Sequence, residues 1–351
     1  MAKIVILGSG VMGTAIALPP AQNGHEVILA GSPLDDALID AMAGLDRAHP
    51  KLGVTMPGTI TLVKDAAISD THFSAADIVL LGVSTPGLPW VLDCISRHVQ
   101  TRPTLMMVTK GLEASPAGQT RTLPHMINET MQDRLGFNLP IVGVGGPCIA
   151  REVAQGQPTA TVFGSTEMEV AKACQTIFQR PDYQVRTTTD LDGLEACAAI
   201  KNFMAIGVAA SWGANPPHNP TEAKSRSMNP AAGSFQQAVT EMAKLCVWLG
   251  GQAETAYQLP GLGDLFVTVN AGRNSRLGFE LGRGLTVSQA MSGKLAGETV
   301  EGVDTGRNLA VGLEAAFADG HLDPSEFPLT RALVTALIGD TLYQIDIRSY
   351  W

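Results

Sequence analysis

The sequence predicts an α/β protein, with a doubly wound sheet over residues 1–187 and an all-helical domain over residues 188–351. Three observations support this fold class. The chain has 351 residues, which is too long for one ordinary core and suggests about two domains. Apolar runs without alternation occur before about residue 188, as in parallel strands that are buried on both faces. After that residue, helical patterns replace them.

The expected elements follow from these patterns in chain order. Seven strands are expected, at residues 3–7, 26–30, 60–63, 78–83, 105–109, 141–144 and 159–163. The helical stretches between them make repeated βαβ units, which wind helices onto both faces of a sheet. Helices are expected in the second part at residues 191–212, 233–249, 277–291 and 305–318. The proline-rich stretch 213–230 is expected to be a loop.

The composition excludes several classes of protein. Hydrophobic residues make up 45% of the chain and charged residues 16%, which favours packed cores over disorder. The formal net charge is −9 with no dense Lys/Arg cluster, so no nucleic-acid partner is expected. Five cysteines without a CxxC pair favour a reduced, cytoplasmic protein. We expect no signal peptide, no metal site and no apolar stretch long enough to span a membrane.

The first candidate site is a glycine-rich motif. Its GxGxxG pattern is formed by Gly8, Ser9, Gly10, Val11, Met12 and Gly13. The motif follows the first strand and opens a helix expected at residues 14–21, a context that disfavours a chance turn and predicts a Rossmann-type dinucleotide site. Such glycines permit the tight turn, the close approach of a pyrophosphate and the packing of helix on strand. Pro19 and Pro20 should end or kink this helix early.

The choice between NAD and NADP stays open in the sequence. An NAD site typically places an acid at the end of the second strand, and an NADP site often places an arginine there. This chain has Ser32 at that position, which suits either cofactor, with Asp35 and Asp36 just beyond.

Two loops follow predicted strands at the edge where ligands bind in open α/β sheets. Lys110 follows the strand at 105–109, and the alternative is a solvated lysine. Gly146 and Pro147 follow the strand at 141–144 and suit an anion held by backbone N–H groups, although a simple turn would have the same sequence.

The second part of the chain holds the candidate acid/base group. Lys201 and Asn202 lie in an almost wholly apolar helical stretch. Burial lowers the pKa of a lysine, as a general acid/base requires, and the alternative is a side chain that reaches the surface. Asp264 is a candidate partner for Lys201. Arg273 and Asn274 precede a helix and suit a phosphate, or else form a surface turn with a helix cap.

Together these motifs resemble the NAD(P)-dependent glycerol-3-phosphate dehydrogenases over nearly the whole chain. The markers are Gly8–Gly13, Lys110-Gly111, Gly146-Pro147, Ala150, Glu152, Lys201-Asn202, Gly261–Asp264, Thr268, Arg273-Asn274 and Val300-Glu301-Gly302. Residues 49–54, with the sequence His-Pro-Lys-Leu-Gly-Val, are more similar to archaeal-type members than to the common bacterial ones.

The resemblance implies a role for each marker. Lys201 would be the proton donor and acceptor, Lys110 would polarise the carbonyl and hold the substrate, and Asp264 would orient Lys201. The remaining implied contacts are to the substrate from Gly146, Asn202, Thr268, Arg273 and Asn274, and to the cofactor from Ala150, Glu301 and again Arg273. The resemblance also implies a homodimer and a small phosphorylated ketone or polyol as substrate.

Departures from the family pattern leave the exact polyol phosphate open. Gln236 and Gln237 stand in the segment where the family usually carries a basic residue, and Cys148 replaces a small polar residue after Gly-Pro. Two alternatives remain. One is a hydroxyacid dehydrogenase whose Arg273 and Asn274 bind a carboxylate. The other is a non-catalytic dinucleotide sensor, which the presence of Lys110, Lys201 and Asp264 disfavours.

Overall fold

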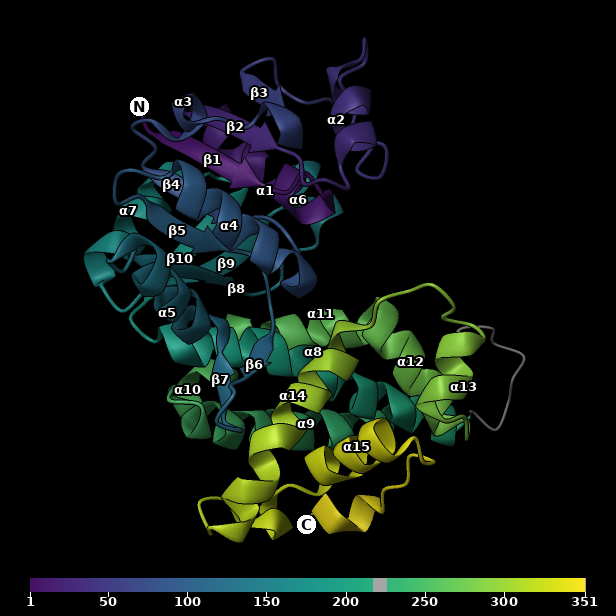
Figure 1. Ribbon diagram of the computed structural model, residues 1–351. Helices are drawn as coiled ribbons and strands as arrows, with labels where there is room; N and C mark the ends of the chain where they lie inside the picture. The colour runs from purple at the N-terminus through teal and green to yellow at the C-terminus, as the bar shows by residue number, and fades with distance from the viewer. Residues whose placement is uncertain (217–225, 351) are drawn as a thin grey trace. The chain divides into compact units, whose positions relative to one another are not determined.

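The computed structural model describes residues 1–216 and 226–350, which divide into two compact units (Figure 1). The sheet unit contains Met1–Lys110 and Pro124–Leu191, and the helical unit contains Gly111–Leu123 and the chain from Asp192 onward. This division differs from the expected boundary after residue 187, because a short internal segment belongs to the second unit.

The sheet unit has strands that are buried along most of their length. Its elements are β1 (Lys3–Leu7), α1 (Val11–Gln22), β2 (Glu26–Ala30), α2 (Asp36–Ala43), β3 (Ile60–Val63), α3 (Asp70–Phe73), β4 (Ile78–Leu81), α4 (Leu88–His98), β5 (Thr104–Met107), α5 (Leu123–Leu135), β8 (Ile141–Gly145), α6 (Ala150–Ala154), β9 (Thr159–Gly164), α7 (Met168–Phe178) and β10 (Tyr183–Thr188). All seven expected strands form.

The strand order in the sheet is β10-β9-β8-β5-β4-β1-β2-β3. The central strand β1 pairs in parallel with both β2 and β4, so the chain turns to opposite sides of β1. That reversal opens a ligand-binding crevice at the carboxyl ends of the strands in folds of this kind. The sheet is not wholly parallel, since β8 and β9 pair antiparallel. The edge strand β10 was not expected, because its buried and exposed residues alternate and it lacks an apolar run.

Helix α1 is longer than expected, because its two prolines do not end it early. The helix runs Val11–Gln22 with Pro19 and Pro20 inside. Both prolines lie in the last turn, where their carbonyl oxygens still accept bonds from Asn23 (3.1 Å) and His25 (3.1 Å). Each proline costs the helix one i→i−4 hydrogen bond, and here that loss falls in the last turn.

The helical unit is mostly rather than wholly helical. Its elements are β6 (Leu112–Ala114), β7 (Thr120–Thr122), α8 (Leu191–Ala214), α9 (Met228–Trp248), α10 (Ala253–Ala256), α11 (Asp264–Asn270), α12 (Arg273–Gly282), α13 (Val287–Ser292), α14 (Glu301–Ala318) and α15 (Pro328–Gly339). The unexpected hairpin of β6 and β7 is held to α14, since Thr120 Oγ1 donates to the carbonyl of Asn308 (2.7 Å) and Asn308 Nδ2 donates to that of Leu112 (2.6 Å).

Two other expectations for this unit need correction. The helix expected at 277–291 is two helices, because Gly284 (φ 91°) ends α12 in the left-handed region. The loop expected at 213–230 is shorter, since α8 ends at Ala214 and α9 begins at Met228. Residues 217–225 of that expected loop lie outside the described residues.

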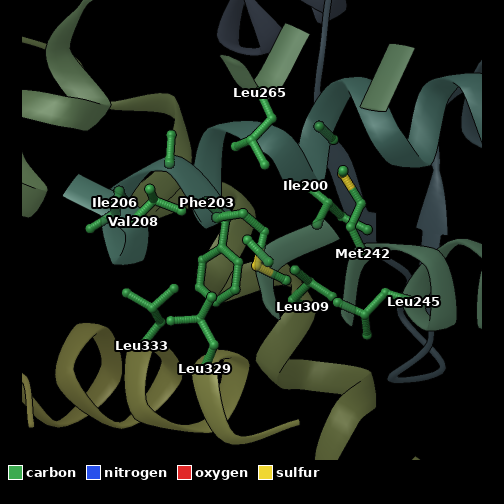
Figure 2. Close-up of a cluster of buried hydrophobic side chains, with 14 of the residues drawn as sticks. Ile200, Phe203, Ile206, Val208, Met242, Leu245, Leu265, Leu309, Leu329 and Leu333 are labelled. Carbon is green, nitrogen blue, oxygen red and sulfur yellow. The ribbon is translucent and has the colours of Figure 1, made fainter. Parts of the chain in front are cut away.

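Helix α8 is the centre of the helical core. Phe203 points toward Leu329 and Leu333 of α15, while Ile200 lies near Met242 of α9 (Figure 2). In the described part of the chain, α8 is the helix whose length and mean hydropathy (1.3) would allow it to cross a membrane, and this corrects the expectation that none would. The whole of that apolar window is buried inside the protein.

Candidate functional site

In the sheet unit, the glycine-rich loop joins β1 to α1 and leaves room for a ligand. Gly8 has φ 106°, a left-handed value that favours glycine. A Cβ on Gly13 would collide with the carbonyl of Gly8, so α1 can approach the strand only with glycine there. A Cβ on Gly10 would meet no protein atom within 4 Å. The loop therefore has the open space that a pyrophosphate needs, at the N-terminus of a 12-residue helix.

At the end of β2, the carboxylate of Asp35 turns back toward the glycine-rich loop. Asp35 Oδ2 accepts hydrogen bonds from the backbone N–H groups of Ser9 (3.1 Å) and Ser32 (2.9 Å), and from Ser32 Oγ (2.8 Å). Sequence reasoning placed Ser32 at this corner and left Asp35 beyond it. The backbone N–H of Asp35 donates to the carbonyl of Ser32 (2.9 Å), and this turn brings the Asp35 side chain back to Ser32. Pro33 alone does not predict such a turn.

Three candidates of this unit remain, and two of them follow neighbouring strands. Lys110 comes shortly after β5 and is half-buried, and its carbonyl accepts a hydrogen bond from Thr85 Oγ1 (3.1 Å). Gly146 follows β8, is buried, and has φ 122°. Ala150 begins α6 and is half-buried. Because β5 and β8 are parallel neighbours, their carboxyl ends reach the same edge of the sheet.

In the helical unit, Lys201 is a buried ammonium group with fixed partners. Its side chain is 8% exposed. Nζ donates to Asp264 Oδ1 (2.9 Å) and to Thr268 Oγ1 (2.8 Å). The hydroxyl of Thr268 donates in turn to the backbone carbonyl of Asp264 (2.7 Å), which leaves its lone pairs directed toward Lys201. The predicted pairing of Lys201 with Asp264 is thus present in the structure.

The local sequence explains why Asp264 and Thr268 lie together. A π-helical turn over Leu259–Gly263 leads directly into α11, which begins at Asp264. Asp264 and Thr268 are four residues apart and so share one face of α11, the face turned to Lys201. A Cβ on Gly261 would collide with the backbone of Ala256, so the tight turn before α11 requires glycine. π-Helical turns are rare and occur frequently at functional sites.

A second network fixes the residues beside Lys201. Asn202 Nδ2 donates to Glu301 Oε2 (3.0 Å), and Asn274 Nδ2 donates to Asn202 Oδ1 (3.0 Å). Asn274 Oδ1 accepts from the backbone N–H of Gly302 (2.9 Å). A Cβ on Gly302 would lie 2.5 Å from the carbonyl of Asn202, so α14 can approach α8 this closely only with glycine.

Arg273 stands at the open side of this network. It is the first residue of α12, after Gly272 (φ 106°), and its side chain is 48% exposed. Nη2 lies 3.9 Å from Glu301 Oε1, a loose ion pair that leaves the guanidinium able to bind another anion. The first backbone N–H groups of α12 point out of the N-terminal end of the helix, and the helix dipole favours negative charge there.

The predicted site residues thus form two groups, each within one unit. In the helical unit, hydrogen bonds join Lys201 to Asp264 and Thr268, and a second set joins Asn202 to Asn274 and Glu301, with Arg273 beside Glu301. The glycine-rich loop, Ser32, Lys110, Gly146 and Ala150 belong to the sheet unit. Sequence reasoning missed the bonds of Asp35, and it gave no role to His49, whose side chain is fully buried. Within the described residues, no group of three or more His, Cys, Asp or Glu side chains could hold a metal ion.

Comparison with known protein families gives a match to both units. The model of the amino-terminal part of the NAD-dependent glycerol-3-phosphate dehydrogenases matches residues 3–171. The model of the carboxyl-terminal part of the same family matches residues 190–344.

Individual relatives are similar along most of their length. The NADP(+)-dependent glycerol-3-phosphate dehydrogenase of Archaeoglobus fulgidus is 34% identical over 289 residues, which cover 82% of each chain. The glycerol-3-phosphate dehydrogenase (NAD(P)+) of Paracidovorax citrulli is 31% identical over 312 residues, covering 88% of this chain and 86% of that one. The crystal structure of glycerol-3-phosphate dehydrogenase from Coxiella burnetii superposes with a TM-score of 0.76 at 25% identity, over 99% of this chain and 97% of that one.

Proposed function

The chain belongs to the NAD-dependent glycerol-3-phosphate dehydrogenase family, and from this premise we propose that Lys201 gives a proton to the substrate oxygen and takes it back in the reverse reaction. The protein is an oxidoreductase that acts on a CH–OH group with NAD or NADP. The reaction interconverts sn-glycerol 3-phosphate and dihydroxyacetone phosphate, or acts in the same way on a closely related polyol phosphate.

One observation carries this assignment, namely the buried ammonium of Lys201 between Asp264 and Thr268. A buried charge is costly unless it is paired, so an apolar helix keeps such a lysine only where its partners are supplied. Asp264 balances the charge and, with Thr268, fixes the direction of Nζ. The proton that Lys201 transfers thus starts from a defined position, which general acid catalysis needs.

The other residues divide between the reacting carbonyl, the phosphate and the cofactor. When bound, the nicotinamide cofactor would supply or accept the hydride at the carbonyl carbon. Lys110 polarises the carbonyl, and positive charge there stabilises the developing alkoxide. Gly146 offers its backbone N–H to the substrate.

The start of α12 binds the phosphate of the substrate. Arg273 binds it with its half-exposed guanidinium, and the N-terminal N–H groups of the helix add further donors. Asn274 has one Nδ2 hydrogen in a bond to Asn202 and keeps the second for the phosphate. Asn202 and Thr268 hold the network in place.

Most of the residues that we propose to bind the cofactor belong to the sheet unit. Gly8–Gly13 bind the pyrophosphate, Ser32 lies at the adenosine ribose, and Ala150 lines the nucleotide site. The open space at Gly10 and the free helix N-terminus fit this group. From the helical unit, Glu301 and Arg273 are proposed to contact the cofactor. Residues 1–187 are thus the nucleotide-binding part and the later residues the substrate-binding part, with the hairpin of β6 and β7 grouped with the latter.

Replacing Lys201 by methionine tests the central role. The Lys201→Met variant keeps much of the apolar stem and loses the ammonium, so we expect turnover to fall about 10²–10⁴-fold. Dinucleotide affinity should not change, because the glycine-rich loop belongs to the other unit. Single-turnover hydride transfer and dinucleotide fluorescence measure the two quantities. The matched control is Lys244→Met, which removes a lysine of the same unit that pairs with Glu326 (3.0 Å). Near-normal hydride transfer in Lys201→Met would remove Lys201 from the mechanism.

We also propose that the protein acts in the cytoplasm as a homodimer. Large apolar side chains that stay exposed support a protein interface, among them Tyr257 (55%), Phe266 (61%) and Ile338 (55%). Sedimentation equilibrium measures the oligomeric state.

A further inference from the structure

One oxygen of the Asp35 carboxylate, Oδ2, braces the glycine-rich loop. This oxygen accepts from three donors, two on Ser32 and one on the backbone of Ser9. A carboxylate that reads NAD hydrogen-bonds the ribose 2′-OH, and in Asp35 one of the two oxygens is already engaged by the protein. Asp35 therefore connects the end of β2 to the loop, and its charge is largely compensated by the donors around it.

The segment 47–56 is built against the same corner. Ala48 and Thr55 form a β-bridge, and Leu52 and Met56 are each 1% exposed within the hydrophobic core of the sheet unit. Between them, the imidazole of His49 is fully buried. Burial lowers the pKa of His49, while the nearby backbone of Ser9 acts to raise it, so the imidazole lies close to the glycine-rich loop.

Two buried polar atoms at this corner have no hydrogen-bond partner. They are His49 Nε2 and Ser9 Oγ. Nδ1 of His49 accepts from the backbone N–H of Lys51 (3.1 Å), so the neutral ring carries its proton on Nε2. Unpaired buried polar atoms are uncommon, and two together mark a place that a ligand or an ordered water completes.

Two cationic residues, one on this segment and one in α6, lie close together in the fold. Lys51 is exposed and directly follows Pro50 in the loop, and Nη2 of Arg151 in α6 donates to the carbonyl of Lys51 (3.3 Å). In the described part of the chain, neither side chain has a carboxylate within 4 Å, although other exposed lysines such as Lys64 do. Two unpaired cations on a protein of net charge −9 indicate an anionic ligand.

We propose that Lys51 and Arg151 bind the 2′-phosphate of NADP(H), and that this protein therefore prefers NADP(H) to NAD(H). The proposal rests on the dehydrogenase function proposed above. The adenosine ribose of a dinucleotide lies at the end of the second strand, which here is Ser32, and the segment carrying Lys51 packs against that corner. Asp35 acts as a positioning residue for the loop, and it does not read the 2′ position.

Binding measurements with both cofactors test this inference without relying on activity. Dissociation constants for NADPH and NADH are measured by fluorescence titration, for the wild type and for Lys51→Ala and Arg151→Ala. We expect the wild type to bind NADPH more tightly. Each variant should weaken NADPH binding about tenfold, the size of one charge-assisted contact, and leave NADH binding unchanged. The matched control is Lys64→Ala, which removes an exposed lysine that already pairs with Asp40 (2.7 Å).

Asp35→Asn separates the brace from a ribose ligand. If Asp35 braces the loop, the Asp35→Asn variant should bind NADPH and NADH more weakly by the same factor. Loss of NADH binding alone would make Asp35 the residue that reads the ribose and would overturn the inference, as would equal effects of Lys51→Ala on the two cofactors or a wild type that prefers NADH. Failure of the wild type to bind either dinucleotide would overturn the proposed function as well, so the two failures are distinguishable.

Discussion

At the scale of single residues, the protein keeps one buried ammonium group and surrounds it with oxygen atoms from a second helix. Lys201 is on α8, whereas Asp264 and Thr268 are on α11. The free energy of burying an unpaired ion is several kcal/mol, so removing Asp264 would leave a charge that the apolar surroundings cannot solvate. The ion pair and the proton-transfer role thus have the same structural basis.

Gly10 allows a residue-scale prediction that separates binding from folding. Gly10 has φ −61° and ψ 178°, values that other residues adopt, and a Cβ there meets nothing. Gly10→Val should therefore fold with an unchanged melting temperature, while its side chain fills the space of the pyrophosphate. We expect the Kd for dinucleotide to rise at least about tenfold. Fluorescence titration alongside thermal unfolding measures both quantities, and unchanged affinity in the folded variant would contradict the assignment of this loop.

Arg273 gives a prediction about the phosphate. Removing one charge-assisted contact of about 1.5–3 kcal/mol should lower kcat/KM for dihydroxyacetone phosphate about 10–150-fold in Arg273→Ala. For unphosphorylated dihydroxyacetone, which never used the contact, the change should be small. Arg276→Ala is the matched control, since that side chain is on the same helix and pairs with Glu298 (2.7 Å). If both substrates lose activity by the same factor, Arg273 serves only the structure or the cofactor and does not bind the phosphate.

At the scale of elements, close helix crossings hold the catalytic network together. Gly302 brings the start of α14 onto Asn202 of α8, and Glu301 reaches Asn202 because of this approach. Gly278 of α12 likewise comes against the carbonyl of Ile206. Glycines at these crossings act as spacers of minimum size, which is why the second half of the site depends on helix packing as well as on its polar residues.

The crossing at Gly302 is testable with a matched pair of helical glycines. In Gly302→Ala, a Cβ 2.5 Å from the carbonyl of Asn202 forces α14 away, and overpacking of this kind typically lowers the free energy of unfolding by 1–3 kcal/mol. Turnover should also fall, since Asn202 and Glu301 move. In Gly233→Ala on α9, the nearest atom is Ile347 Cδ1 at 3.5 Å, so stability should rise by about 0.4–1 kcal/mol. Urea unfolding compares the two, and equal stabilities would contradict the packing argument.

At the scale of the whole molecule, the parts that local patterns encode could be predicted. Continuous apolar runs in the sequence predicted strands that all form in the structure. The apolar residues around Lys201 in the sequence predicted that its side chain is buried. The hairpin of β6 and β7 could not be predicted, because its three-residue strands carry little signal and Thr120 binds a carbonyl 188 residues away. The bonds of Asp35 depend on a turn whose partners lie in two loops, so its place became visible only in the fold.

The reaction itself gives the most direct test of the whole account. The loss of NADH or NADPH absorbance is followed with dihydroxyacetone phosphate, with unphosphorylated dihydroxyacetone and with a 2-keto acid of similar size. We expect the phosphorylated ketone to be reduced with the highest kcat/KM, because Arg273 and the start of α12 bind a dianion better than a neutral alcohol or a carboxylate. Preferred reduction of the keto acid would contradict the account in favour of a hydroxyacid dehydrogenase. Dinucleotide binding without turnover of any of the three ketones would contradict it in favour of a sensor.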